Sequence, residues 1–480
     1  MLDLLTDLMD KADGRCAYAE ARHVHTRSEE LGVLNGQVDD IGIAEGEGLG
    51  VRVRIGGGWA FAATRDVSAA GAERALARAL AVAEAQPRGA VAPAVLAPVD
   101  PARGEWSGPC GVDPFSISLE DKLAHLFAAE ALMRGDERIV RAEGHLTAIR
   151  TTKSFASTDG AACTQMATEC GGGVQATAIA DGELQVRSYP NSHGGHVAAA
   201  GWEHVLELDL AGNAPRVADE AIALLTAPAC PGGIRTVVIH DEQLALQIHE
   251  SIGHALELDR ILLGEASYAG TSWVSPGDFG SLRYGSELLN ITADATVTGG
   301  LGTFGWDDEG VAALRTPLVV GGVLRAALSD RESAATIGLD RSGGCARADG
   351  FARQPIVRMT NVSIDPGDAG TLADLIADTD DGVYFESNRS WSIDDRRLQF
   401  QFATEVTREI KGGELGKLYR NGSYAGITPR FWGSLDAVCS APAWRLWGLM
   451  NCGKGEPGQV MHVSHGAAPA RFRDVQVGVA

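Results

Sequence analysis

Long apolar runs are missing from this sequence, and so is a secretory leader. No run approaches the roughly 20 apolar residues that a membrane-spanning helix needs, which argues against an integral membrane protein. The first residues, MLDLLTDLMDKADGR, carry neither the basic segment nor the small-residue cleavage site of a signal peptide. We therefore expect a cytoplasmic protein without a membrane partner.

Cysteine pairs with regular spacing are also missing. The eight cysteines are scattered through 480 residues and form no CxxC pair. In a long cytoplasmic chain, cysteines of this kind are expected to be free thiols rather than a disulfide framework.

Basic residues are few relative to acidic ones. The chain has 41 Lys and Arg against 63 Asp and Glu, a formal net charge of −22. A surface this acidic repels phosphate backbones, so we expect no nucleic-acid partner. Attraction of neutral or basic peptides is one explanation of this charge, and an ordinary solvated surface is the simpler one.

Length and element order predict two domains of an α+β protein. A chain of 480 residues exceeds what one core usually holds. The Pro- and Gly-rich joint PACPGG (228–233) separates a helical pattern from IRTVVIH, a strand of β-branched residues. We predict an α+β domain over 1–230 and a β-rich domain over 231–480. Elements expected in the first are a Gly-turn hairpin over 48–64, short strands over 137–200, and helices over 69–86, 118–135 and 213–227.

The stretch HESIGHALE (249–257) lies on a predicted helix. Leu244, Ile248, Ile252 and Leu256 recur every four residues as a core-facing stripe. The zinc-protease spelling H-E-x-x-H places its histidines four apart, whereas His249 and His254 are five apart. On a regular helix, residues five apart diverge by about 140°, against about 40° for four. Both histidines can bind one metal only if the helix is broken or widened into a π-turn over 251–253.

A third ligand is needed for a catalytic zinc site. Glu257 follows three residues after His254, and Cys452 lies in the glycine-rich stretch NCGKGEPGQ (451–459). The residues alone do not decide between Glu257 and Cys452 as the third ligand. They also leave open that the two histidines share a helix without binding a metal.

Four motifs in order resemble the TldD/PmbA (TldE) family of peptidases, formerly described as modulators of DNA gyrase. These are HESIGHALE, WDDEGV with LRT (306–316), RMTN (358–361) and CGKGEPGQ, preceded by GLGVRVRIGGGWAFAAT near the start. The resemblance covers nearly the whole chain and points to the metal-bearing TldD branch.

The resemblance implies a zinc metallopeptidase with His249, His254 and Cys452 as zinc ligands and Glu250 as the catalytic glutamate. It implies an N-terminal α+β domain followed by a β-rich domain holding the site. It further implies dimers, either of this chain or with a PmbA/TldE-like chain, and substrates that are unfolded or extended peptides.

Each implied residue has a chemical role. Neutral imidazoles and a thiolate bind Zn²⁺, which activates water, and Glu250 would take the water proton and pass it to the leaving amine. Glu257 would orient His254 or be a solvated carboxylate. His462 and His465 would assist at the carbonyl oxygen or be structural, WDDEG would be a turn or a substrate-contact loop, and NRSWSIDDRR (388–397) would be a surface connection.

Two other functions remain open at this stage. A non-catalytic, zinc-containing assembly or peptide-binding subunit needs ligands but no adjacent base, so the intact Glu250 favours the enzyme. A metal-dependent amidase acting on a small molecule shares the motif and would differ in the length of its substrate cleft.

Overall fold

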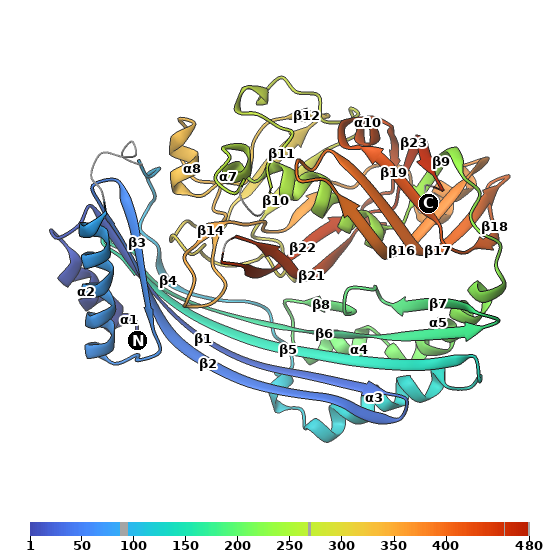
Figure 1. Cartoon of the computed structure of the whole chain (residues 1–480), viewed down its shortest axis with the longest axis horizontal. Helices are drawn as coiled ribbons and strands as arrows, with labels where there is room; N and C mark the ends of the chain where they lie inside the picture. The colour runs from blue at the N-terminus through green and yellow to red at the C-terminus, as the bar shows by residue number, and fades with distance from the viewer. Residues whose placement is uncertain (87–94, 267–269, 456, 479–480) are drawn as a thin grey trace.

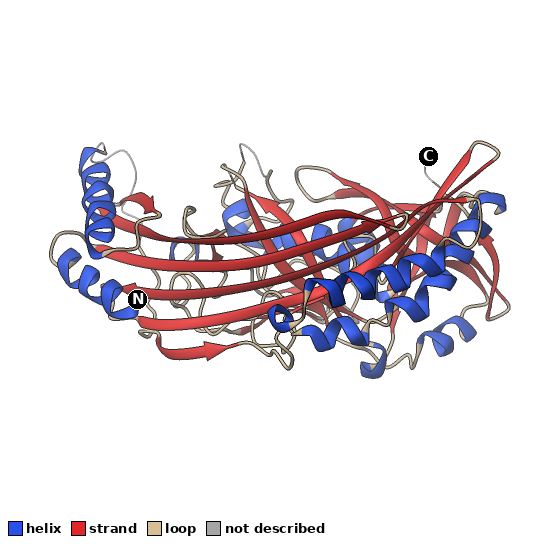
Figure 2. Ribbon diagram, turned by 90° about the horizontal axis from the view of Figure 1, so that it is seen from below, coloured by secondary structure: helices blue, strands red, loops and turns tan. Residues whose placement is uncertain are grey.

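The first half of the chain forms one long, strongly curved sheet (Figures 1 and 2). The computed structural model describes all residues except 87–94, 267–269, 456 and 479–480. Within the described residues the strand order is β3-β2-β1-β5-β6-β4, with β7 and β8 also paired to β6, and all pairs except β4–β6 are antiparallel. The strands are β1 (Tyr18–Leu34), β2 (Gln37–Ile55), β3 (Gly58–Thr64), β4 (Arg103–Ser107), β5 (Ile139–Ser157), β6 (Ala162–Ala180), β7 (Glu183–Tyr189) and β8 (His196–Ala198).

Helices cover one face of this sheet. They are α1 (Leu2–Ala12), α2 (Ala69–Ala85), the short 3₁₀ turn η1 (Pro114–Ser116), α3 (Leu119–Met133), α4 (Trp202–Glu207) and α5 (Leu210–Thr226). Side chains alternate between the two faces of a strand. Leu31 and Leu146 therefore pack against α3 and α5, while Thr26 and Thr151 point the other way and line a cavity of about 280 Å³ beneath the second half of the chain.

The short strands expected over 137–200 are instead dominated by two strands of 19 residues, β5 and β6. The expectation rested on glycines read as breaks, but Gly171 and Gly172 lie inside β6. A Cβ at Gly171 would stand 2.0 Å from the carbonyl oxygen of His196, and one at Gly172 would stand 2.3 Å from that of His145. These glycines allow neighbouring backbone to approach closely rather than ending the strand.

The second half is built around a closed ring of strands. The order β16-β9-β23-β19-β17 is closed by pairing of β17 with β16, and β18 and β20 attach to β17 and β23. These strands are β9 (Gly233–Ile239), β16 (Asp381–Ile393), β17 (Gln399–Lys411), β18 (Glu414–Tyr419), β19 (Ser423–Ile427), β20 (Leu435–Val438) and β23 (Ala470–Val477). The mixture of helices and mostly antiparallel strands confirms the α+β class and the β-rich second half.

Smaller sheets and short helices complete this half. A four-stranded sheet and two hairpins comprise β10 (Ile291–Asp294), β11 (Arg315–Val320), β12 (Val323–Leu324), β15 (Val362–Ile364), β13 (Ala346–Arg347), β14 (Ile356–Val357), β21 (Arg445–Lys454) and β22 (Gln459–Ala467). The helices are α6 (Asp241–Ile248), α7 (Leu258–Ile261), α8 (Arg331–Thr336), α9 (Leu372–Ala377) and α10 (Thr428–Gly433), with 3₁₀ turns η4 (Pro276–Asp278) and η5 (Ala441–Ala443). No helix among the described residues combines the length and hydrophobicity that crossing a membrane requires.

The helix carrying the histidine motif changes its winding at the motif. Helix α6 passes into a π-turn, η2 (His249–Gly253), then a 3₁₀ turn, η3 (His254–Leu256), before α7 begins. The predicted stripe is confirmed, since Leu244, Ile248, Ile252 and Leu256 are all fully buried in the core. The widened turn predicted from the five-residue spacing is therefore present.

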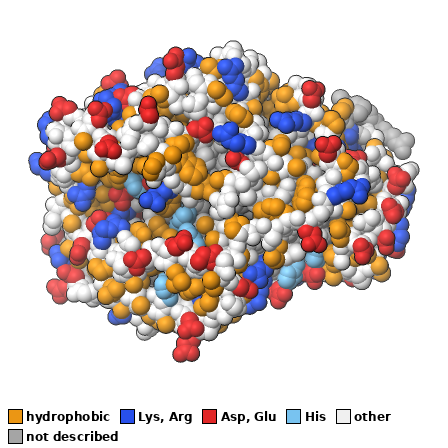
Figure 3. Space-filling model, turned by 180° about the vertical axis from the view of Figure 1, so that it is seen from behind, with side chains coloured by type: hydrophobic (Ala, Val, Ile, Leu, Met, Phe, Trp, Pro, Cys, Tyr) orange, Lys and Arg blue, Asp and Glu red, His pale blue; other side chains and the backbone are white. Residues whose placement is uncertain are grey.

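Buried ion pairs join the two halves. Arg52 on β2 contacts Glu20 at 2.9 Å and Glu309 at 2.7 Å, and Lys153 on β5 contacts Asp308 at 3.1 Å. The turn expected at WDDEG is present at 308–309, but its carboxylates are buried against the first half. Elsewhere charge is mixed, and Figure 3 shows acidic and basic side chains interspersed over one face.

Candidate metal centre

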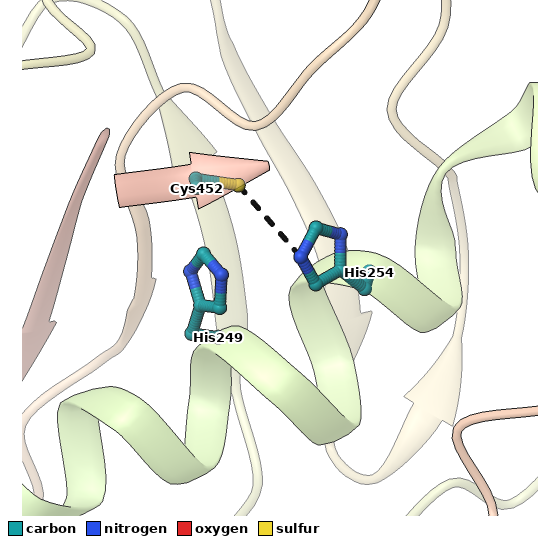
Figure 4. A group of neighbouring side chains, drawn as sticks. All are labelled: His249, His254 and Cys452. Carbon is teal, nitrogen blue, oxygen red and sulfur yellow. Dashed lines mark hydrogen bonds between the residues drawn. The ribbon is translucent and has the colours of Figure 1, made fainter. Parts of the chain in front are cut away.

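The structure brings His249, His254 and Cys452 together (Figure 4). Their ligand atoms all lie within 4.8 Å of one another, and all three side chains are buried. The π-turn places the two imidazoles on the same side, with ring centroids 4.7 Å apart. Cys452 comes from β21, next to a bulge in its pairing with β22, and its Sγ lies 3.7 Å from His254 Nε2.

Gly253 makes this winding possible beside Met359. A Cβ at Gly253 would stand 2.1 Å from the sulfur of Met359. Met359 is itself fully buried in the core, so a side chain at position 253 would force either Met359 or η2 to shift within a close-packed region. A shift of η2 would displace the two histidines.

The tautomer of His249 is fixed by His465. His465 Nδ1 lies 2.8 Å from the carbonyl oxygen of Val362, which can only accept, so this nitrogen carries the proton. Burial, reinforced by His249, holds the pKa of His465 well below its ordinary value, so the ring is neutral and its Nε2 accepts. His249 Nδ1, 2.8 Å from that Nε2, therefore donates, and the Nε2 lone pair of His249 is left free for a metal.

Glu257 plays the same part for His254. Its carboxylate lies 2.9 Å from His254 Nδ1 and 2.7 Å from Arg260 Nε, and Lys454 Nζ is 3.4 Å away. Burial opposes ionisation, but Lys454, His254 and Arg260 outweigh it and hold the pKa of Glu257 well below its usual value. The carboxylate is thus charged and accepts a hydrogen bond from the Nδ1–H of His254. The Nε2 lone pair of His254 is then available to a metal. Of the two roles left open for Glu257, the contacts favour orientation of His254.

Cys452 has the environment of a thiolate. Burial alone would raise the pKa of its thiol, but sharing of the thiol proton with His254 Nε2 and the charge of the nearby Arg358 guanidinium outweigh burial and lower it. Arg358 also donates to the backbone oxygen of Cys452. Two neutral imidazoles and one thiolate form a nitrogen and sulfur donor set that suits Zn²⁺ better than Mg²⁺ or Ca²⁺.

Glu250 is held beside the cluster by two residues from the segment 388–397, which we expected to be a surface connection. Trp391 Nε1 donates to one carboxylate oxygen at 2.9 Å, and Arg397 Nη1 contacts the other at 2.6 Å. The segment 388–397 is mostly exposed, as predicted, but residues 388–393 belong to β16, and Trp391 and Arg397 contact Glu250 in the π-turn. The tryptophan and the arginine within this polar segment are the only local features of the sequence that could have indicated a contact with Glu250.

The remaining candidates lie outside the cluster. His462 lies one residue after Met461, the pairing partner of Cys452, and its side chain faces the 280 Å³ cavity instead. There its Nδ1 contacts Glu169 at 2.6 Å. The structure thus separates the two histidines, with His465 at the metal centre and His462 at the contact between the halves. Glu456 lies outside the described residues.

Acidification is expected to destabilise the metal-free chain through this cluster. Burial lowers the pKa of both His249 and His254 to about 4, against about 6.5 in an unfolded chain. Between these values only the unfolded state binds the protons, so stability present at pH 7 is lost as pH falls. We expect a loss of about 2 kcal/mol per imidazole between pH 7 and pH 5.

Urea unfolding with a chelator at both pH values measures this loss. The double variant His249→Gln/His254→Gln should lose about 4 kcal/mol less than the natural chain over the same interval. An equal loss in both proteins would place the acid sensitivity elsewhere.

Comparisons with known proteins agree with this fold. Models of the PmbA/TldA metallopeptidase domain 1, central domain and C-terminal domain match residues 19–83, 112–227 and 232–479. A metalloprotease of Methanocaldococcus jannaschii is 27% identical over 439 residues, covering 91% of this chain and 92% of the relative. A metalloprotease of Methanothermobacter thermautotrophicus is 35% identical over 263 residues, 55% of this chain and 54% of the relative.

Solved structures share the fold at low sequence identity. TldE from Thermococcus kodakarensis superposes with a TM-score of 0.77 at 14% identity, covering 99% of this chain and all of that one. A candidate modulator of DNA gyrase from Thermotoga maritima gives a TM-score of 0.77 at 17% identity, covering 99% of each chain. Since the three family models together match most of its length, the chain belongs to the PmbA/TldD family of metallopeptidases.

Proposed function

We propose that this protein is a zinc-dependent peptidase that hydrolyses peptide bonds in unfolded or extended peptides. His249, His254 and Cys452 would hold the zinc ion, and Glu250 would act as the general base. The observation that carries this proposal is the position of Glu250, because a carboxylate fixed beside a His₂Cys donor set is what hydrolysis needs and a structural zinc site does not.

The chemistry divides between the metal and the chain. A bound zinc ion would lower the pKa of water and polarise the scissile carbonyl. Glu250 would take the proton of the attacking water on a carboxylate oxygen and return it to the leaving amine nitrogen. Trp391 and Arg397 each donate to one oxygen of that carboxylate. They therefore fix the rotamer of Glu250, and the remaining lone pairs of the two oxygens stay available to take the proton. His465 and Glu257 keep the two imidazoles in the tautomer that presents Nε2.

Burial of the cluster supports an extended substrate. The side chains of His249, His254 and Cys452 are only 2 to 4% exposed. A folded protein could not bring a backbone amide to such a depth, whereas a single extended strand could. Purified chain reconstituted with zinc should cleave an unstructured casein fragment and leave native lysozyme intact.

If the chain is instead a non-catalytic zinc-containing assembly or peptide-binding subunit, the same assay should show no cleavage of the casein fragment. Such a subunit would bind zinc and the casein fragment with the same affinity in the natural chain and in a Glu250→Gln variant, and would cleave neither substrate. Zinc-loaded chain that binds the fragment without cleaving it, alone or mixed with a TldE-like chain, would favour this alternative.

Loss of Arg397 is expected to slow turnover without releasing the metal. In Arg397→Met the carboxylate of Glu250 keeps only the Trp391 contact and samples other rotamers. We expect kcat to fall by about tenfold or more, with KM and zinc content little changed. The exposed neighbour Arg396 supplies the control Arg396→Met, which should behave like the natural chain. Equal rates in the two variants would remove Arg397 from this role.

We further propose a cytoplasmic dimer, formed with itself or with a PmbA/TldE-like chain, with each chain divided into two domains near residue 230. Structural similarity to TldE supports this kind of pairing, and closing a second subunit over the metal centre would exclude folded proteins. Light scattering of the purified chain, alone and with a TldE-like chain, should give the mass of a dimer. A monomer under both conditions that digests native lysozyme would contradict this assembly.

A further inference from the structure

A loop from the first half of the chain reaches the metal centre. Residues 190–195 connect β7 to β8 and carry His193. The His193 amide donates to Asn191 Oδ1 at 2.9 Å, and Gly194 and Gly195 adopt φ values of +81° and +74°. A Cβ at Gly195 would stand 2.0 Å from the carbonyl oxygen of Gly172 on β6. The loop is therefore pressed against the sheet, which fixes the position of His193.

His193 packs against the residue that holds the proposed base. Its ring centroid lies 5.4 Å from that of Trp391 at an interplanar angle of 73°, and Trp391 donates to Glu250. His193 also lines a small cavity together with Trp447 and His465, the partner of His249. One ring contact and one shared cavity thus place His193 next to the residues that hold Glu250 and His249, although it comes from the other half of the chain.

One ring nitrogen of His193 is buried without a partner. Its Nε2 is inaccessible to solvent and has no hydrogen-bond partner among the described residues. By contrast, His249, His254 and His465 all have ring-nitrogen partners. Buried polar atoms in folded proteins are nearly always bonded, so an exception beside a reaction centre calls for a ligand.

His193 is neutral at physiological pH. Burial, reinforced by the nearby His249, lowers its pKa to about 4. A neutral imidazole carries one N–H and can donate one hydrogen bond. In a site with little water, a fixed neutral donor stabilises negative charge that develops on a substrate oxygen.

We propose that His193 is a further catalytic residue, whose Nε2–H donates to the carbonyl oxygen of the scissile peptide as that oxygen gains negative charge. His193 changes no covalent bond, and the proton stays on the imidazole throughout. This role rests on the proposed peptidase function and adds to it a donor supplied by the first half of the chain. The reaction centre is then complete only when both halves are in contact.

Three variants separate this role from simple packing. His193→Phe keeps a ring against Trp391 and removes the donor, and His193→Gln keeps a donor of similar reach. His204→Phe is the control, because its Nε2 is also buried without a partner but its ring packs on His196. Zinc content confirms that each variant retains the metal centre.

Rates and binding of a transition-state mimic are then compared. His193→Phe should lower kcat on the casein fragment by 10² to 10³-fold, with KM within about threefold. A phosphinic peptide, which mimics the tetrahedral state, should bind more weakly by a similar factor, measured by calorimetry. The kcat of His193→Gln should be at least about tenfold higher than that of His193→Phe. The kcat of His204→Phe should match that of the natural chain.

The outcomes distinguish this role from the function on which it rests. If the natural zinc-loaded chain cleaves casein and binds the phosphinic peptide, but His193→Phe does both equally well, the role of His193 is wrong and the peptidase stands. A rise in KM alone, or an equal loss in His204→Phe, would also overturn it. If the natural chain neither cleaves casein nor binds the phosphinic peptide, the peptidase function and this role fall together.

Discussion

Replacing Glu250 with glutamine is expected to abolish peptide hydrolysis while leaving the zinc site filled. Glutamine has nearly the same shape and can keep one hydrogen bond to Trp391 or Arg397, but it cannot take a proton from water. General-base catalysis contributes about 10² to 10⁴-fold, so we expect kcat to fall by on the order of 10³-fold. Casein-fragment cleavage and zinc analysis on the same preparation measure both quantities.

The control for this experiment is Glu409→Gln. Glu409 lies on β17, where its carboxylate accepts from Tyr419 at 3.3 Å, and it has no contact with the metal centre among the described residues. It should keep both rate and zinc. If Glu250→Gln retains more than about a tenth of the natural rate, another group must take the proton, and the assignment of the base is wrong.

Cys452→Ser is expected to lose the metal. A serine hydroxyl is not ionised at neutral pH and is a poor ligand for zinc, whereas the thiol of Cys452 has a lowered pKa and would bind as thiolate. Residues that merely orient ligands change metal affinity by 10 to 100-fold, so loss of a ligand should exceed about 100-fold. Competition with a chromophoric zinc chelator measures this affinity directly.

Stability provides a second measurement for the same variant. Free zinc at 100 times its dissociation constant should stabilise the natural chain by about 2.7 kcal/mol in urea unfolding, and the same zinc concentration should not stabilise Cys452→Ser. The half-buried thiol Cys230 supplies the control Cys230→Ser, which should retain the zinc response. A normal zinc response in Cys452→Ser would exclude the thiolate as a ligand.

The spacing of His249 and His254 made the π-turn predictable. A five-residue spacing between two candidate ligands on one helix leaves few geometries, and the positions of Leu244 to Leu256 in the core limit them further. Local winding follows from local sequence in this case, because both constraints lie within one short segment.

The partners of the cluster could not be predicted in the same way. His465, Trp391 and Arg397 lie 216, 141 and 147 residues along the chain from the residues they contact. Their positions depend on β16 pairing with β9 and on β22 lying beside the π-turn. A polar strand end such as NRSWSIDDRR has the same composition as a solvated loop until that pairing is known.

Strand length in the first half was unpredictable for a related reason. Gly171 and Gly172 look like turn residues, and their function is visible only once β8 and β5 lie against β6. The same close packing holds the loop of His193 in place. Element order thus predicted the fold class and the spacing of His249 and His254 predicted the π-turn, while contacts between distant strands determined which side chains surround the candidate metal centre.

X-ray absorption spectroscopy at the zinc edge, on the purified and zinc-loaded chain, tests the central claim most directly. With His249, His254 and Cys452 as ligands, the spectrum should require one sulfur at about 2.3 Å and two imidazole nitrogens at about 2.0 to 2.1 Å. In Cys452→Ser the sulfur contribution should disappear. A natural chain that binds one zinc ion with no sulfur neighbour, or that binds no zinc at all, would contradict the proposed metal centre.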